Sequence, residues 1–92
     1  MTSKSKQPAI PEGYFRLGPA AERLKLSRQT IEYYLLLGLI EPRRVEGRHG
    51  RFFDEALLTQ IRTIRELNQS GYTLRDIREM FLAKGEEHGV SH

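Results

Sequence analysis

The sequence predicts one mainly α-helical domain, with four helices and a short β-hairpin between the second and the third. Three observations lead to this fold class. Apolar residues recur at helical spacing in four separate segments, residues with capping side chains precede three of them, and a basic stretch with two glycines divides the second segment from the third. A chain of 92 residues has room for a single small domain.

Composition excludes several classes of protein. The chain has 38% hydrophobic residues and no cysteine, which excludes disulfides, thiolate metal sites and a cysteine nucleophile. No apolar run approaches the roughly 18 residues of a membrane span, and the N-terminus lacks the apolar stretch of a secretory signal. We therefore expect a cytoplasmic protein with no membrane contact, no metal and no cofactor.

Three segments differ in character along the chain. Residues 1–13 mix polar residues, proline and glycine with almost nothing to bury, which predicts a flexible N-terminal arm. Residues 14–84 carry the helical patterns and form the predicted domain. Residues 85–92 lack an apolar pattern, and we expect a disordered tail.

The first two helices are separated by only about two residues. Leu17, Ala20, Ala21 and Leu24 recur at helical spacing and predict a helix over about 18–25, with Pro19 tolerated in its first turn. Ser27 can cap a second helix over 27–37, which Gly38 ends. The inward face of this second helix is Ile31, Tyr34, Leu35 and Leu39. Two short helices with so tight a turn are typical of a helix-turn-helix.

The second half begins with the basic segment 43–53, in which Gly47 and Gly50 separate two stretches that can be extended, 43–45 and 51–53. We interpret this segment as a hairpin. Asp54 can cap a third helix, whose apolar stripe is Leu57, Leu58, Ile61, Ile64 and Leu67 and which Gly71 ends. Thr73 and Asp76 have the spacing of a capping box before a last helix over about 74–84.

Positive charge gathers in the first half of this domain. Residues 14–53 carry eight Arg or Lys against four Glu, whereas residues 54–92 carry five against seven acidic residues. Within residues 43–51 there are four arginines and one glutamate. The planar guanidinium suits phosphate and guanine edges, although a run of charge can also be a loop that only aids solubility.

The second helix of a helix-turn-helix enters the major groove of DNA. Here it offers Arg28 for guanine, Gln29 for adenine and Glu32 for the amino group of cytosine. The alternative is an ordinary solvated helix face. The basic hairpin directly after this helix favours DNA, because a basic wing beside a recognition helix can grip the flanking backbone.

An enzyme is not expected. A domain of this size seldom forms the concave pocket that shifts the pKa values of acids and bases. His49 lies on a glycine-flanked loop with no cysteine and no second histidine near it in sequence. The glycines around it follow no strand into a helix, as those of a nucleotide-binding loop would.

The stretch from Phe15 to about Phe81 resembles the DNA-binding domain of the MerR family of winged-helix transcription regulators. The motifs that carry the resemblance are Phe15-x-Leu17-Gly18, Ser27-x-x-Thr30-Ile31-x-Tyr33-Tyr34, Gly38-Leu39-Ile40-x-Pro42, Arg51-x-Phe53 and Gly71-Tyr72-x-Leu74-x-x-Ile77. The resemblance implies a winged helix-turn-helix and a homodimer on an inverted-repeat operator. With the residues above, it gives as the expected DNA-binding set Arg16, Ser27, Arg28, Gln29, Thr30, Glu32, Tyr33, Tyr34, Arg43, Arg44, Arg48, His49 and Arg51.

This chain departs from the family pattern at several positions. Glu32 stands where the family commonly has arginine, and phosphates would repel it unless it accepts a hydrogen bond from the amino group of a base or pairs with a nearby arginine. Lys25 replaces a usual turn glycine, and Leu35 and Leu36 replace acidic residues. We expect Leu35 in the core and Leu36 at the surface, where it is a candidate for contact with a protein partner.

We do not expect the family's long dimerisation helix or its effector domain in this chain. We therefore expect a homodimer, at least on DNA, that forms through the N-terminal arm, through the Leu36 surface or on DNA itself. Two other functions stay open. One is a small excisionase-like protein that bends DNA for a recombinase. The other is a protein-interaction module whose partner faces Leu36, Glu32 and the basic hairpin.

Overall fold

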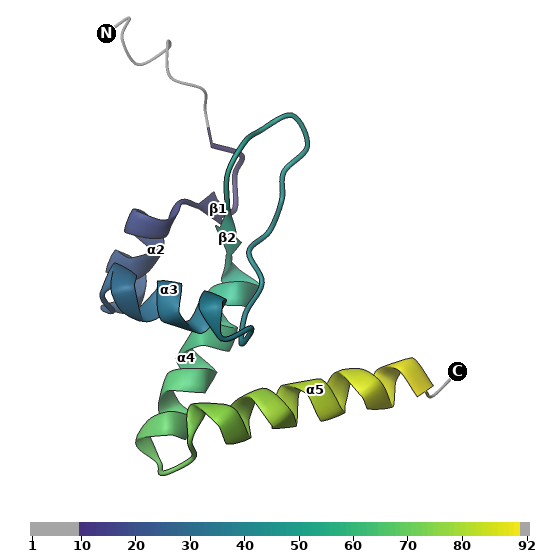
Figure 1. The fold of residues 1–92 in the computed structure, drawn as a ribbon. Helices are drawn as coiled ribbons and strands as arrows, with labels where there is room; N and C mark the ends of the chain where they lie inside the picture. Colours follow the sequence, from purple (N-terminus) through teal and green to yellow (C-terminus); the bar gives the residue numbers. More distant parts are fainter. Residues whose placement is uncertain (1–9, 91–92) are drawn as a thin grey trace, which may run out of the picture.

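The computed structural model describes residues 10–90, with side chains described up to residue 83. Residues 1–9 of the expected arm and the last two residues of the expected tail lie outside the described range. Within residues 10–90, four helices and one two-stranded antiparallel sheet form a mainly α-helical domain, which confirms the predicted fold class (Figure 1). The elements are β1 (Tyr14–Phe15), α2 (Leu17–Leu24), α3 (Arg28–Leu36), β2 (Phe53–Asp54), α4 (Glu55–Gln69) and α5 (Leu74–Val90).

Side chains cap α3 and α4 as the sequence predicted. The amide of Thr30 donates to Ser27 Oγ at 3.1 Å, and the amide of Leu57 donates to Asp54 Oδ1 at 2.9 Å. Each of these bonds satisfies one amide of the first helical turn, which has no partner within the helix.

The capping box of α5 is also present. The Asp76 amide donates to Thr73 Oγ1 at 3.0 Å, and the Thr73 amide donates to Asp76 Oδ2 at 3.4 Å. This reciprocal arrangement starts α5 at Leu74, as predicted. The helix runs to Val90, whereas the sequence suggested an end near residue 84.

The turn between α2 and α3 is made by Lys25 in the left-handed conformation, with φ of 58°. The amide of Leu26 donates to the carbonyl of Ala21 at 3.0 Å, which closes the end of α2. A residue with a Cβ adopts this conformation at a cost of about 1 kcal/mol. The tight turn brings α3 directly against α2, as a helix-turn-helix requires.

The strands pair differently from the predicted hairpin. β1 pairs with β2, so that Tyr14 faces Asp54 and Phe15 faces Phe53. The two sides of the predicted hairpin, 43–45 and 51–53, meet only at one bridge, where Arg43 and Phe52 exchange backbone hydrogen bonds of 2.7 and 3.0 Å. The chain between them forms the loop that rises beside β1 in Figure 1, and residues 43–53 are called the wing below. Residues 14–15, for which the sequence predicted no strand, thus close the base of the wing.

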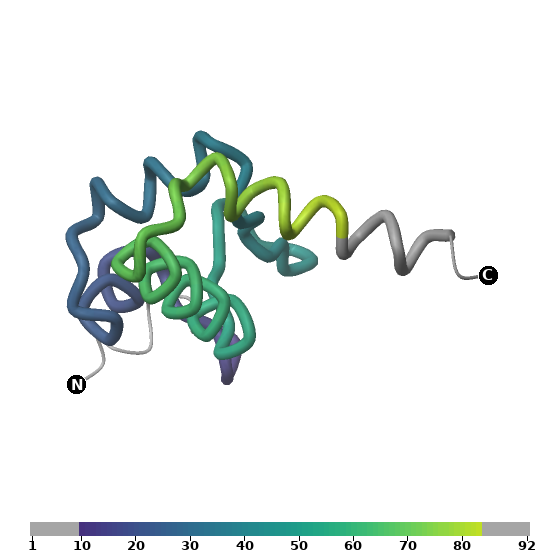
Figure 2. Tube along the Cα trace, turned by 90° about the horizontal axis from the view of Figure 1, so that it is seen from below, coloured from purple at the N-terminus to yellow at the C-terminus, as the bar shows by residue number. Residues whose placement is uncertain are grey.

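The core lies between α2, α3 and α4. Its largest fully buried side chains are Phe52, Phe53, Ile31, Leu57, Leu58, Ile61, Ile64 and Ile77. Figure 2, which looks nearly along α4, shows α5 leading away from the other helices. Ile77 and the half-buried Phe81 anchor the first turns of α5 on the core. None of the helices in residues 10–90 combines the length and apolar character needed to cross a bilayer.

Candidate nucleic-acid interface

The outward face of α3 presents polar side chains over an apolar inner face. Ile31 and Tyr34 are buried against the core, and the opposite side of the helix faces solvent. The exposed residues of this outer face are Arg28, Gln29, Glu32, Tyr33 and Leu36. Their spacing of three or four residues brings them to one surface of the helix.

Tyr34 belongs to the core. Its side chain is 5% exposed, and this burial raises the pKa of the hydroxyl, an effect that the charge of Arg65 opposes. Any contact of Tyr34 with a ligand is therefore limited to its hydroxyl, whereas Tyr33 is half exposed. Ser27 and Thr30 serve the start of α3, because their hydroxyl oxygens also lie 2.9 Å apart in a hydrogen bond.

The guanidinium of Arg28 lies over Gly18 of α2. A Cβ at residue 18 would come within 2.9 Å of Arg28 Nη2. Gly18 therefore provides the space into which the Arg28 side chain fits. The position of this guanidinium at the start of α3 depends on the absence of a side chain at residue 18.

Glu32 of α3 pairs with Arg51 of the wing. Arg51 Nη1 donates to Glu32 Oε1 at 3.0 Å, and Nη2 donates to Oε2 at 2.9 Å. The hydrogen bond with Arg51 lowers the pKa of Glu32, and the same bond raises the pKa of Arg51. The unusual acidic residue on the outer face is thus compensated by an arginine of this chain.

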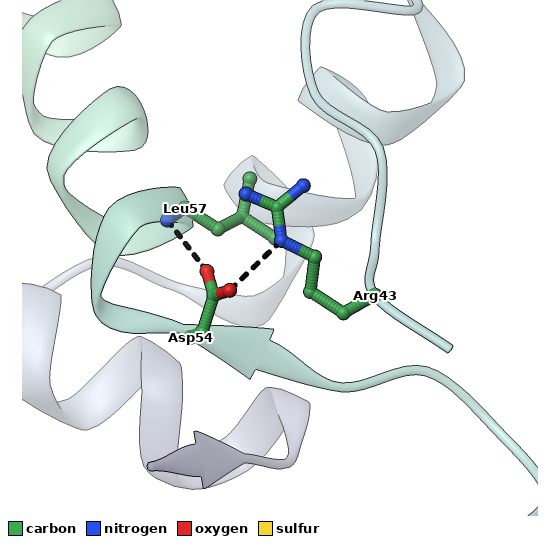
Figure 3. A network of polar contacts seen from close by, with 3 residues as sticks. All are labelled: Arg43, Asp54 and Leu57. Atoms are coloured by element: carbon green, nitrogen blue, oxygen red, sulfur yellow. Dashed lines mark hydrogen bonds and ion pairs between the residues drawn. The ribbon is translucent and has the colours of Figure 1, made fainter. Parts of the chain in front are cut away.

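Arg43, at the start of the wing, is bound to the cap of α4 (Figure 3). Its Nε donates to Asp54 Oδ2 at 3.0 Å, while the other oxygen of Asp54 accepts from the Leu57 amide. Burial raises the pKa of Asp54, but the hydrogen bonds from Leu57 and Arg43 outweigh it, and the net pKa is lowered. The Arg43 head group is therefore engaged at the base of the wing.

Arg16, between β1 and α2, holds the far side of the wing. Its guanidinium carbon lies 4.2 Å from the centroid of the Phe52 ring, and Nη1 donates to the carbonyl of His49 at 3.0 Å. Gly50 has φ of 98°, and a Cβ there would come within 2.5 Å of Arg16 Nη1. The chain at residues 49–52 thus packs directly against this arginine.

Three basic residues of the wing remain. Arg44 and His49 are exposed and Arg48 is half-buried, and none of the three side chains forms an ion pair within residues 10–83. The structure therefore divides the predicted DNA-binding residues into three sets. The first set is exposed or half-buried and forms no ion pair within residues 10–83: Arg28, Gln29, Tyr33, Arg44, Arg48 and His49. The second set is bound to other residues of the domain: Arg16, Ser27, Thr30, Glu32, Arg43 and Arg51. The third is the core residue Tyr34.

The sequence did not reveal four contacts that shape this surface. Gly18 makes room for Arg28, Gly50 and Phe52 pack against Arg16, and Asp54 accepts a hydrogen bond from Arg43. The motif spacing contained Gly18, and the capping pattern contained Asp54, but neither pattern indicates a side-chain partner far away in the chain. Among the described side chains, no three His, Asp or Glu residues gather as metal ligands would.

Comparisons with known proteins give the family. A sequence profile described as MerR HTH family regulatory protein matches residues 15–84. The mercuric resistance operon regulatory protein of Bacillus cereus is 33% identical over 67 residues, which cover 72% of this chain and 50% of that protein. An uncharacterized HTH-type transcriptional regulator, YyaN, of Bacillus subtilis (strain 168) is 29% identical over 65 residues, which cover 71% and 47%. No solved structure matches.

The chain thus spans about half the length of these curated relatives. The profile covers most of the domain, from the strand that closes the wing to the first turns of α5. Together with the helix-turn-helix and the wing, this match shows that the chain belongs to the MerR HTH family of regulatory proteins.

Proposed function

We propose that this chain binds duplex DNA sequence-specifically, as a MerR-like transcription regulator, with α3 in the major groove and the wing on the flanking backbone. One observation supports this proposal most strongly. The two hydrogen bonds between Glu32 and Arg51 join the outer face of α3, which carries the exposed Arg28 and Gln29, to the wing, which carries Arg44 and Arg48.

The side chains of α3 suit contacts with bases, and those of the wing suit contacts with phosphates. The guanidinium of Arg28 can donate two hydrogen bonds to guanine, and the Gln29 amide can pair with adenine. Arg44 and Arg48 have no acidic partner among the described side chains, so their charge is available to phosphates. Phosphate contacts give affinity, and base contacts give sequence preference.

We also propose a homodimer, formed at least on DNA. Two copies bound to an inverted repeat would place their α3 helices about one helical turn of DNA apart. The two-fold symmetry of such a dimer would match the two-fold symmetry of the inverted repeat. Sedimentation of the free chain and of the chain with a palindromic duplex tests this point. A single copy bound to each palindromic duplex would contradict it.

Leu36 is a second proposed contact, with a protein partner that is a second copy of this chain. Its side chain is 81% exposed, and it lines a shallow groove with Tyr33 and Leu74 between α3 and α5. An aliphatic side chain that is so exposed, and that lies beside other apolar groups, favours a contact with another protein chain. Leu36→Gln is expected to weaken assembly on a palindrome while the affinity for a single half-site is kept.

Selection of bound duplexes from a random pool tests the main proposal. We expect an enriched inverted repeat, and an affinity that falls with salt at a log–log slope of about −0.9 per neutralised phosphate. Arg28→Ala should relax the sequence preference, and the control Arg48→Ala should weaken all sequences alike. Equal weakening of every duplex by both variants would contradict this division. Footprints on tandem direct repeats would favour the excisionase-like alternative.

A further inference from the structure

Arg51 faces α3, not the solvent side of the wing. Two of its nitrogens donate to both oxygens of Glu32, at 3.0 and 2.9 Å, across 19 residues of sequence. The motif Arg-x-Phe at the end of the wing led us to expect Arg51 among the DNA contacts. In the structure its charge is already matched, whereas Arg44 and Arg48 have no ion-pair partner within residues 10–83.

Folding stability does not account for this pair. The side chains of Arg51 and Glu32 are 40% and 46% exposed, and ion pairs that water can reach contribute little to stability. What a two-pronged pair supplies is geometry, because the planar guanidinium fixes both the distance and the plane of the carboxylate. The pair therefore sets where the Glu32 carboxylate sits on the outer face of α3.

The held carboxylate retains capacity to accept hydrogen bonds. Its two oxygens offer about four lone-pair positions, and Arg51 uses two of them. Phosphates would repel a bare carboxylate in the major groove, and the adjacent guanidinium offsets this repulsion. The cytosine N4 amino group is the base-edge donor that a carboxylate accepts from.

We propose that Arg51 is a positioning residue and not a phosphate contact: it holds Glu32 so that the free lone pairs of the carboxylate accept from the amino group of a cytosine. This inference rests on the proposed DNA binding and adds to it a base preference. Glu32 then specifies one base pair of each half-site, and the wing takes part in sequence readout through Arg51.

The test compares a charge-matched double variant, Glu32→Gln with Arg51→Gln, with the single variant Arg48→Gln. The double variant keeps the net charge of the pair, so a change in its salt dependence reports a lost phosphate contact and not a changed total charge. Both variants are first checked by urea unfolding. Binding is then measured on the duplex that the unaltered chain selects, at several salt concentrations, and each variant is also put through the pool selection.

We expect the double variant to keep the salt slope of the unaltered chain and to lose a roughly tenfold preference for cytosine at one position of each half-site. Arg48→Gln should keep that preference while its slope becomes shallower by about 0.9. The inference is overturned if the double variant loses as much slope as Arg48→Gln, or if it selects the same bases as the unaltered chain. If the unaltered chain selects no duplex at all, the proposed function itself fails, which is a separate result.

Discussion

Arg43 and Asp54 connect the base of the wing to the start of α4. The guanidinium donates from Nε to one carboxylate oxygen at 3.0 Å, and the second oxygen accepts from the first turn of the helix (Figure 3). The Asp54 side chain thus caps α4 and also binds Arg43 of the wing. A change at residue 54 affects both, whereas a change at residue 43 affects only one.

Asp54→Ala should lower the free energy of unfolding by about 1–2 kcal/mol, because it removes the cap of α4 and the partner of Arg43. The matched variant Arg43→Ala keeps the cap and removes a partly exposed ion pair, so it should cost less than about 1 kcal/mol. Urea unfolding followed by circular dichroism measures both. Equal losses in the two variants would show that the cap is not the main contribution.

Because the pKa of the Asp54 carboxyl is lowered, we predict that the free energy of unfolding falls at acid pH. The pKa of Asp54 lies below its ordinary value of 3.8 in the folded chain, so folding favours the ionised form. Its contribution is therefore complete above pH 3.8 and is lost as the pH falls from there through the folded pKa. Glu32, whose pKa is also lowered from its ordinary 4.5, acts in the same direction.

Melting temperatures measured from about pH 6 down to about pH 2 should therefore fall at the acid end. Asp54→Asn should be less stable at neutral pH and should show a shallower decline below pH 3.8. A decline as steep as that of the unaltered chain would mean that other carboxyl groups carry the acid dependence.

Two glycines of the wing provide a matched pair for testing Arg16. Gly47 and Gly50 both have positive φ, 79° and 98°, so alanine at either position strains the backbone by about 1–2 kcal/mol. Only the Cβ at residue 50 would meet another group, Arg16 Nη1, while nothing lies within 4 Å of a Cβ at residue 47.

Gly50→Ala should therefore release Arg16 from His49 and loosen the wing, and Gly47→Ala should not. Amide hydrogen exchange at residues 49–52 should quicken in Gly50→Ala and in Arg16→Ala. Similar exchange in Gly47→Ala and Gly50→Ala would show that backbone strain, and not the displacement of Arg16, controls the wing.

Gly18→Ala separates stability from DNA binding. Alanine at this position of α2 gains up to about 1 kcal/mol of helix propensity. Its Cβ would lie 2.9 Å from the flexible end of Arg28, which must move away. We expect unchanged or higher stability by thermal unfolding, together with a weaker base preference in the pool selection.

The control for this prediction is the double variant with Arg28→Ala. Once Arg28 is absent, Gly18→Ala should no longer change the selected sequence. An effect of Gly18→Ala that persists in this background would mean that residue 18 acts through another contact.

The sequence was sufficient to predict the helices and their caps, because these are local features. Ser27, Asp54 and Thr73 each bond to an amide within three residues, and such spacing is visible in the sequence. The apolar stripe of α4 was found for the same reason, since it repeats with the helical period. The predicted end of α5 near residue 84 was wrong, because the helix continues to Val90 although Gly85 follows there and the apolar pattern ends.

Contacts between distant residues were not predictable in this way. The pairing of Tyr14–Phe15 with Phe53–Asp54 joins segments about 40 residues apart, and two residues are too few to show the alternation of a strand. Likewise, the motif Arg51-x-Phe53 distinguishes Arg51 from Arg48 by position, but it does not indicate that the Arg51 side chain binds Glu32. Side-chain direction depends on the assembled fold.

The short ladder between β1 and β2 also limits how the chain can vary in length. Because side chains alternate between the two faces of a strand, a slip of one residue would turn Phe53 outward and move the Asp54 carboxylate away from the first turn of α4. An insertion or deletion between residues 44 and 50 leaves this register intact, whereas one between residues 51 and 54 does not. The tip of the wing can thus change in length without shifting this register, while its last residues must keep their spacing to α4.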